Sequence, residues 1–280
     1  MEDQAKQIAK ESKSSFYYAF SLLSPEKRDA MNTVYAFCRK TDDIVDEDYQ
    51  TDDIKYERLR KWRTEFEKAI YGRSDYQLLN KVAYIKKKFN IPMEHFLELI
   101  IGMEMDLQRK RYLHFDDLIE YCYRVASTVG LMCIEIFGYK NNSTRDYAIN
   151  LGLAMQLTNI IRDVGTDSES GRIYIPLKDL NQFNYSESDL FQKKYNSNFK
   201  ALMTFEAERA KEYFNKANQS LYFEDKPALF PARAMQHIYS KLLQKIEKSE
   251  YDVLNKIIKV SKFEKAAISV GVWAKYSLVY

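Results

Sequence analysis

Apolar side chains recur every three to four residues along most of this chain, the period of an α-helix with one buried face. Only residues 171–176 have a β-like pattern, and that run is expected to be an extended loop. With only 8 glycines and 5 prolines in 280 residues, the helices should be long. Helices are expected over 2–13, 16–23, 25–46, 54–71, 76–89, 92–112, 115–138, 144–165, 186–191, 196–220, 227–249 and 260–276.

No repeat, low-complexity tract or linker divides the chain. The pattern therefore predicts an all-α fold, a single helical bundle forming one domain over residues 1–280. Small residues at Ala126, Ser127 and Gly130 indicate that this segment approaches another helix closely or leaves room for a ligand.

The central helical stretch separates apolar and oxygen-bearing side chains onto two faces. The apolar face carries Leu153, Leu157, Ile160 and Val164. The other face carries Gln156, Asn159, Asp163 and Asp167. Carboxylates four residues apart repel each other by roughly 0.2–0.5 kcal/mol, and on a segment apolar enough to be buried they need partners. A hard cation such as magnesium is the simplest partner for carboxylate and amide oxygens.

A second acidic stretch repeats this spacing, because Asp42 and Asp46 are also four residues apart. The same stripe continues back through Arg39, Tyr35, Asn32 and Arg28. Two such helices facing each other would form a box of carboxylates with arginines at its rim, which suits metal ions carrying a phosphate or diphosphate. The alternative is an ordinary solvated helix end. Asp106 could add a third carboxylate, although its own pattern favours a surface acid.

Composition excludes several classes of protein. The 43 basic and 40 acidic residues are interspersed and give a net charge of +3, so nucleic acid is not an expected partner. The three cysteines form no CxxC pair, which favours a reducing compartment such as the cytoplasm. The histidines lack zinc-site spacing. The N-terminus lacks an apolar signal region, and no apolar run reaches the roughly 20 residues that span a bilayer.

The C-terminal stretch from Ala266 to Tyr280 carries a single charge, Lys275. Core packing is the default interpretation of this stretch. Contact with a membrane surface is the alternative, which leaves open a location at the inner face of the membrane. A monomer or a weak dimer is expected.

Several motifs together resemble the squalene and phytoene synthase family, the head-to-head prenyltransferases. They are residues 14–20, 35–46, 121–126, 156–163 and 171–176. Within that family, residues 102–107, 121–124 and 135–139 look most like the bacterial branch that makes presqualene diphosphate for hopanoid synthesis. The resemblance covers nearly the whole chain.

This resemblance implies an isoprenoid-synthase fold around a central cavity, two or three Mg²⁺ ions and two prenyl diphosphates. The implied metal ligands are Asp42, Asp46, Asn159, Asp163 and Asp167. The implied phosphate-binding and orienting residues are Ser14, Ser15, Arg39, Gln156 and Arg162. Phe16 and Phe20 would line the hydrocarbon tunnel, and Tyr121 and Tyr239 would lie near the reacting carbons. Where relatives often carry arginines, this chain has Lys256, Lys259, Lys262 and Lys265.

The implied reaction condenses two farnesyl diphosphates to presqualene diphosphate and releases diphosphate, with reduction to squalene and use of NADPH left open. Condensation of two geranylgeranyl diphosphates to phytoene is one alternative. A metal-dependent diphosphohydrolase would also need facing carboxylates, but it would need a positioned water as well. A non-catalytic helical binding protein of the same fold is the alternative from outside the enzymes.

Overall fold

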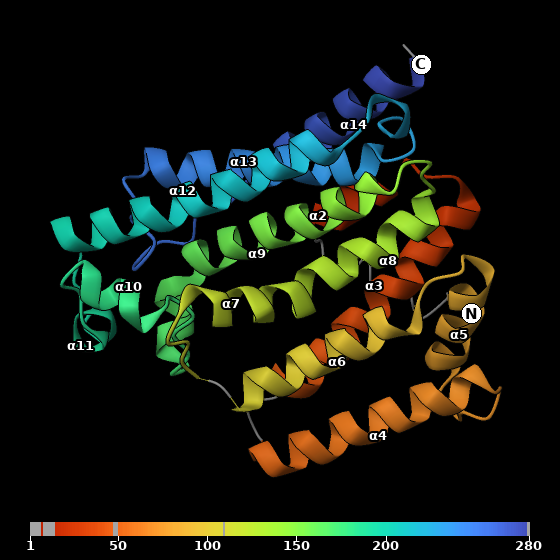
Figure 1. Cartoon of the computed structure of the whole chain (residues 1–280), viewed down its shortest axis with the longest axis horizontal. Helices are drawn as coiled ribbons and strands as arrows, with labels where there is room; N and C mark the ends of the chain where they lie inside the picture. Colours follow the sequence, from red (N-terminus) through yellow and green to blue (C-terminus); the bar gives the residue numbers. More distant parts are fainter. Residues whose placement is uncertain (1–6, 8–14, 47–49, 109, 279–280) are drawn as a thin grey trace.

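The molecule is built from long helices packed in layers (Figure 1). This computed structural model describes residues 7, 15–46, 50–108 and 110–278. Its first helices are α2 (Ser15–Phe20), α3 (Pro25–Asp46), α4 (Asp52–Ile70), α5 (Gln77–Lys88), α6 (Met93–Gln108), α7 (Phe115–Cys122) and α8 (Thr128–Phe137). The later ones are α9 (Ser143–Glu169), α10 (Leu177–Gln182), α11 (Glu187–Phe191), α12 (Ser197–Ser220), α13 (Phe230–Lys248) and α14 (Lys262–Leu278).

The longest helix, α9, runs through the middle of the molecule and packs against α8, α12 and α13. In Figure 1, α12, α13 and α14 lie along one side of α9, and α4 and α5 lie along the opposite side of the molecule. Two further short segments are a 3₁₀ helix, η2 (Phe223–Asp225), and a π-helical segment, η1 (Tyr123–Ser127). The predicted all-α fold is therefore confirmed.

The structure differs from the predicted helices at a few places. The helix expected over 115–138 contains the π segment η1, whose wider turns interrupt the 3.6-residue period. The central helix extends to Glu169, so that Asp167 lies within it. Helix α10 was not expected, because its six residues are too short to show a period. The helix expected over 2–13 lies, apart from Gln7, outside the described residues.

The π segment is wedged between two helices at glycines. A Cβ atom on Gly102 of α6 would lie 2.7 Å from Val125 Cγ1, and one on Gly152 of α9 would lie 2.6 Å from Ser127 Cα. Only a residue without a side chain permits such a close backbone approach. The small residues expected to allow close helix packing do so, and this contact fixes how α6, η1 and α9 surround the centre of the molecule.

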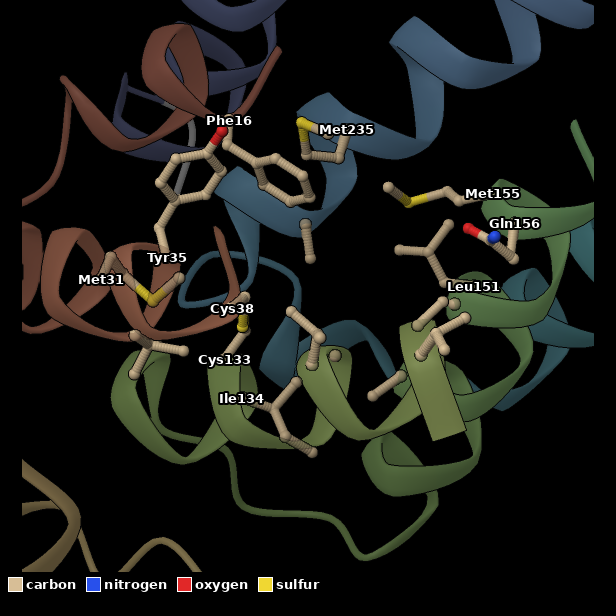
Figure 2. A pocket seen from close by; sticks show the side chains of 18 of the residues that line it. Phe16, Met31, Tyr35, Cys38, Cys133, Ile134, Leu151, Met155, Gln156 and Met235 are labelled. Carbon is tan, nitrogen blue, oxygen red and sulfur yellow. The ribbon is translucent and has the colours of Figure 1, made fainter. Parts of the chain in front are cut away.

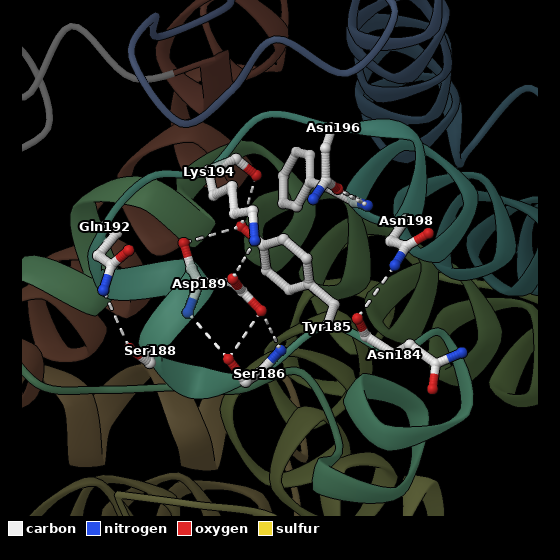
Figure 3. Close-up of polar contacts among 10 residues, drawn as sticks. Asn184, Tyr185, Ser186, Ser188, Asp189, Gln192, Lys194, Asn196 and Asn198 are labelled. Carbon is white, nitrogen blue, oxygen red and sulfur yellow. Dashed lines mark hydrogen bonds and ion pairs between the residues drawn. The ribbon is translucent and has the colours of Figure 1, made fainter.

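Polar contacts fasten the connection between α10 and α12 (Figure 3). Ser186 caps α11 by accepting a hydrogen bond from the Asp189 amide at 3.0 Å, while the Asp189 carboxylate accepts from the Ser186 amide at 3.0 Å. The Tyr185 hydroxyl lies 3.0 Å from the Lys194 carbonyl. These bonds fix the approach to α12, which packs along the length of α9.

Side chains of α4 hold the C-terminal turns of α3 in place. Buried Lys55 donates to the carbonyl of Val45 at 2.8 Å, and the Trp62 indole donates to the Thr41 hydroxyl at 2.9 Å. A cation at the negative end of a helix dipole is favourable, so Lys55 offsets part of the cost of ending this helix on acidic residues. The turn that carries Asp42 is thereby held in place.

The close contact at Gly152 leads to a stability prediction. We expect Gly152→Ala to lower the free energy of unfolding by about 1–3 kcal/mol, because the new Cβ would meet backbone atoms of the π segment. Gly271→Ala in α14 is the matched control, since nothing lies within 4 Å of its Cβ position, and should be neutral or stabilising by up to about 1 kcal/mol. Urea unfolding measures both, and equal effects of the two substitutions would contradict the structure.

Candidate active site

An elongated apolar cavity of about 290 Å³ lies at the centre of the bundle. Figure 2 shows side chains from α2, α3, α8, α9 and α13 pointing into it. Along α3 the lining runs from Met31 to Asp42, and along α9 from Tyr147 to Asn159. At 1.5 Å per residue these two lining stretches are about 16–18 Å long. The far end of the cavity is apolar and its other end is polar.

A row of aromatic rings forms one wall of the cavity. The Phe16 ring lies 5.9 Å from Tyr35 and 5.5 Å from Phe20. The Phe20 ring in turn lies 6.4 Å from Phe137. Phe137 is close to the start of α3, because its carbonyl accepts a hydrogen bond from Lys27 at 2.6 Å. The Phe20–Phe137 pair therefore closes the end remote from the acidic residues.

Carboxylates from three helices gather at the polar end. Burial raises the pKa of Asp42 to about 6, and the charges of Asp46 and Asp106 add to the effect. Burial likewise raises the pKa of Asp167 to about 7, with further contributions from Asp163 and Asp106. Because the charge of Asp106 affects the pKa values of both Asp42 and Asp167, the acidic residues of α3 and α9 lie around a shared region. Their negative charge is only partly compensated by the protein.

Asp106 is not a surface acid, so the interpretation favoured by its own sequence pattern was wrong. Its side chain is 6% exposed and accepts hydrogen bonds from Tyr121 at 2.9 Å and Tyr174 at 2.8 Å. The rings of these two tyrosines stack at 5.2 Å, and Tyr112 packs against both. The two donors come from 15 and 68 residues away along the chain, which is why no local pattern revealed the site.

Arg172 joins the ends of the two acid-bearing helices. The chain turns back after α9 at Gly171, whose φ of +77° favours glycine. The Arg172 amide then donates to the Asp167 carbonyl at 2.9 Å, while its guanidinium lies 3.4 Å from an Asp46 oxygen of α3. Residues 171–176 belong to the motifs that carry the family resemblance, but the sequence predicted no role for Arg172 itself.

Further cations surround the same end of the cavity. The Arg39 guanidinium contacts Asp42 at 2.9 Å, and Arg162 binds Asp163 through two hydrogen bonds. Lys265 of α14 lies near Arg162, and its pKa is lowered by burial and by the charges of Arg162 and Lys259. Positive side chains that lie this close together repel each other, and a bound anionic ligand would relieve that repulsion. The structure thus places Lys265, one of the lysines found where relatives often carry arginines, near Arg162.

Asn159 and Gln156 extend the polar end along α9. Both line the cavity, and the Asn159 amide lies 3.4 Å from the Gln156 side-chain oxygen. The Asn159 Oδ1 atom is buried and has no hydrogen-bond partner within the protein. A buried oxygen without a partner costs free energy, so a ligand that it could bind would be favourable here. Tyr239 of α13 lines the cavity next to these residues.

The structure brings most of the predicted site residues together. Those that line the cavity are Phe16, Phe20, Arg39, Asp42, Gln156, Asn159 and Tyr239. Asp46, Asp163, Asp167 and Arg162 surround its polar end, and Tyr121 lies behind it on Asp106. Ser14 lies outside the described residues, and only the backbone of Ser15 is described. The chemical roles of these residues stay predictions.

Two absences were found in the part of the chain that the structure describes. No three His, Cys, Asp or Glu side chains lie close enough together to hold a metal ion by themselves. Among the same residues, none of the helices has the length and apolar character needed to cross a bilayer.

Comparison with known proteins gives a consistent result. The family model for squalene/phytoene synthase matches residues 9–264. The 15-cis-phytoene synthase of Synechococcus elongatus is 35% identical over 94% of this chain and 89% of its own. That of Synechocystis sp. is 36% identical over 90% of this chain and 78% of its own.

Solved structures agree in fold. A dehydrosqualene synthase crystallised with a ligand has a TM-score of 0.85 and 29% identity, over 99% of this chain and 96% of its own. Squalene synthase HpnC from Alicyclobacillus acidocaldarius has a TM-score of 0.78 and 24% identity, over 88% of this chain and 94% of its own. The chain therefore has the isoprenoid-synthase fold and belongs to the squalene/phytoene synthase family of head-to-head prenyltransferases.

Proposed function

We propose that this enzyme condenses two farnesyl diphosphates head to head into presqualene diphosphate, with Mg²⁺ and release of diphosphate. The observation that carries the proposal is the polar end of the cavity, where the acidic turns of α3 and α9 meet beside a long apolar space. Diphosphate would bind at that end and a prenyl chain would extend into the cavity. The family model, which spans 9–264, supports a single domain for this work.

The residues at the polar end fit magnesium. Crowded carboxylates with raised pKa values and the unpartnered Asn159 oxygen are the hard oxygen ligands that Mg²⁺ prefers. Magnesium usually binds through one or two carboxylates together with substrate phosphates, so a ready-made three-carboxylate cluster is not required. Asp42 and Asp46 would hold it from α3, and Asn159, Asp163 and Asp167 from α9. Bound there, the ion would act as a Lewis acid that neutralises the leaving diphosphate.

Cations of the protein would complete the diphosphate site. Arg39, Arg162 and Arg172 each already contact a carboxylate of the acidic motifs, so they can share their remaining donors with phosphate oxygens. Lys265 adds a positive charge from α14. The family resemblance assigns Ser14 and Ser15 to the same diphosphate site.

The cavity suits the carbon chemistry that follows departure of diphosphate. Breaking the C1–O bond of one substrate leaves an allylic cation, which water would quench, so an apolar enclosure is needed. The faces of Phe16, Tyr35 and Tyr239 border this space and can each stabilise a nearby cation by roughly 0.5–2 kcal/mol. The C2–C3 double bond of the second substrate then attacks the cation, and loss of one proton closes the cyclopropane ring.

The released diphosphate is the better acceptor of that proton. Burial and the negative charge of Asp106 raise the pKa of Tyr121 well above its ordinary value, so its hydroxyl is a poor general base at neutral pH. Tyr121 instead donates to Asp106 and orients that carboxylate toward the acidic motifs. We infer that Tyr121 positions Asp106 and closes the site to water.

The cavity length favours farnesyl over geranylgeranyl chains. An extended farnesyl backbone spans roughly 14 Å and a geranylgeranyl backbone roughly 19 Å, given C–C bonds of about 1.5 Å. The farnesyl chain is shorter than the stretches of α3 and α9 that line the cavity, and the geranylgeranyl chain is slightly longer, which supports the farnesyl assignment. Synthesis of phytoene from two geranylgeranyl diphosphates is the second candidate, favoured by the names of the cyanobacterial relatives.

The first test is product analysis. The enzyme is incubated with Mg²⁺ and farnesyl or geranylgeranyl diphosphate, with and without NADPH, and the products are identified by mass spectrometry. We expect presqualene diphosphate from the C15 substrate, and NADPH shows whether reduction to squalene follows. Exclusive use of the C20 substrate would favour phytoene synthesis. Hydrolysis without carbon–carbon bond formation, or no metal-dependent binding of farnesyl thiodiphosphate, would contradict a synthase.

The second prediction concerns the acidic motifs. We expect Asp42→Asn and Asp163→Asn each to lower turnover by at least about 10²-fold, because each removes a charge that would hold the metal. Asp146→Asn, on the exposed start of the same helix as Asp163, is the control and should retain turnover. Circular dichroism checks that all three variants are folded. Normal turnover in both motif variants would rule out this site.

Asp42→Asn should also change stability in a pH-dependent way. Because the folded pKa of Asp42 is about 6, above its unfolded value near 4, its charge destabilises the metal-free protein at pH 8. The variant should therefore be more stable than wild type at pH 8, and this advantage should fade as the pH falls through about 6. Added Mg²⁺ should raise the melting temperature of wild type more than that of the variant. An unchanged Mg²⁺ response would contradict the assignment.

The third prediction tests the closed end of the cavity. Phe20→Leu should shift the kcat/KM ratio toward geranylgeranyl diphosphate by about tenfold, because a smaller side chain lengthens the space. Phe199→Leu makes the same change at a fully buried ring of α12 that does not line the cavity. It should lower stability without changing the substrate preference, and a similar shift in both variants would contradict the argument.

A further inference from the structure

The outer face of α14 carries an exposed apolar stripe. Phe263, Ala267, Val270 and Gly271 are all exposed, and their spacing places them on one face of the helix. The Phe263 side chain is 90% exposed and Val270 is 51% exposed. Ile257, at 53%, precedes them in the extended segment that leads into α14. The opposite face, with Ser269, Val272 and Tyr276, is buried.

Basic side chains surround this stripe. Between residues 255 and 276 there are five lysines and one acidic residue, Glu264. Glu264 is bound to Lys245 at 2.6 Å and does not offset the charge of the others. Lys259, Lys262 and Lys275 are exposed. Together, the stripe, Ile257 and these three lysines form what we call the α14 surface.

The α14 surface lies close to the candidate active site. In Figure 1, α14 runs along the outer edge of the molecule beside α13. It packs against α13 and α2, and α2 supplies Phe16 and Phe20 to the cavity wall. On its inner side α14 carries Lys265, near Arg162. One layer of helices therefore separates the exposed stripe from the cavity.

We propose that the α14 surface docks on an anionic lipid bilayer. An apolar helix face flanked by lysines lies in the membrane interface, with its large side chains at the boundary of headgroups and acyl chains. Each lysine near an anionic surface adds a favourable contribution that salt screens. Because no described helix can cross a bilayer, the contact would be peripheral. If the proposed function holds, docking would bring poorly soluble prenyl chains close to the cavity.

A second copy of the chain fits this surface less well. In a symmetric dimer the same patch meets itself, so the lysines of both copies would be brought together. Like charges brought face to face across an interface disfavour association. An anionic bilayer supplies the opposite charge and an apolar layer at once.

The test measures binding to vesicles without any substrate, so its outcome does not depend on the proposed reaction. The full chain is sedimented with vesicles of phosphatidylcholine alone or of an equal mixture of phosphatidylcholine and phosphatidylglycerol, at low and at physiological salt. We expect binding to the mixed vesicles that weakens with salt and little binding to phosphatidylcholine alone. Lack of binding to the mixed vesicles at low salt would overturn the proposal.

Variants locate the contact. Phe263→Ser with Val270→Ser, and separately Lys262→Glu, should each reduce partitioning onto mixed vesicles by about tenfold or more. Tyr71→Ser with Tyr84→Ser is the control, because these side chains are 77% and 60% exposed and lie directly after α4 and on α5, away from α14. The control should bind like wild type. Equal loss in all variants, or a stripe variant that only turns a dimer into a monomer in sedimentation equilibrium, would overturn the proposal.

Discussion

The rest of this structure depends on one constraint. Negative charge lies at one end of the apolar cavity, and the protein compensates that charge only in part. Three helices, α3, α6 and α9, bring carboxylates to the same region, although repulsion and burial both disfavour it. Arg39, Arg162 and Arg172 each contact carboxylates of these motifs. A cation and an anionic ligand bound in this region would relieve that repulsion.

Much of the fold serves to keep this charge cluster in position. Lys55 and Trp62 brace the end of α3 from below. Glycines let the π segment lie between α6 and α9, so that Tyr121, two residues before it on α7, reaches Asp106. Gly171 turns the chain so that Arg172 reaches across to Asp46. Holding these charges together lowers the stability of the isolated protein, as is usual for functional sites.

The sequence allowed prediction of the parts that depend on local periodicity. The long amphipathic helices and the shared face of Asp163 and Asp167 follow from spacing alone. The buried state of Asp106, the bridge made by Arg172 and the position of Lys265 depend on residues far away in the chain, so no local pattern contains them. The six-residue α10 and the five-residue η1 are too short to show a period.

A prenyl diphosphate has a charged head and a long oily tail, and the molecule is divided in the same way. The cavity places cations and carboxylates at one end and aromatic and aliphatic side chains along the rest. Helix α14 repeats this division across its width, with Lys265 facing inward near Arg162 and Phe263 facing outward.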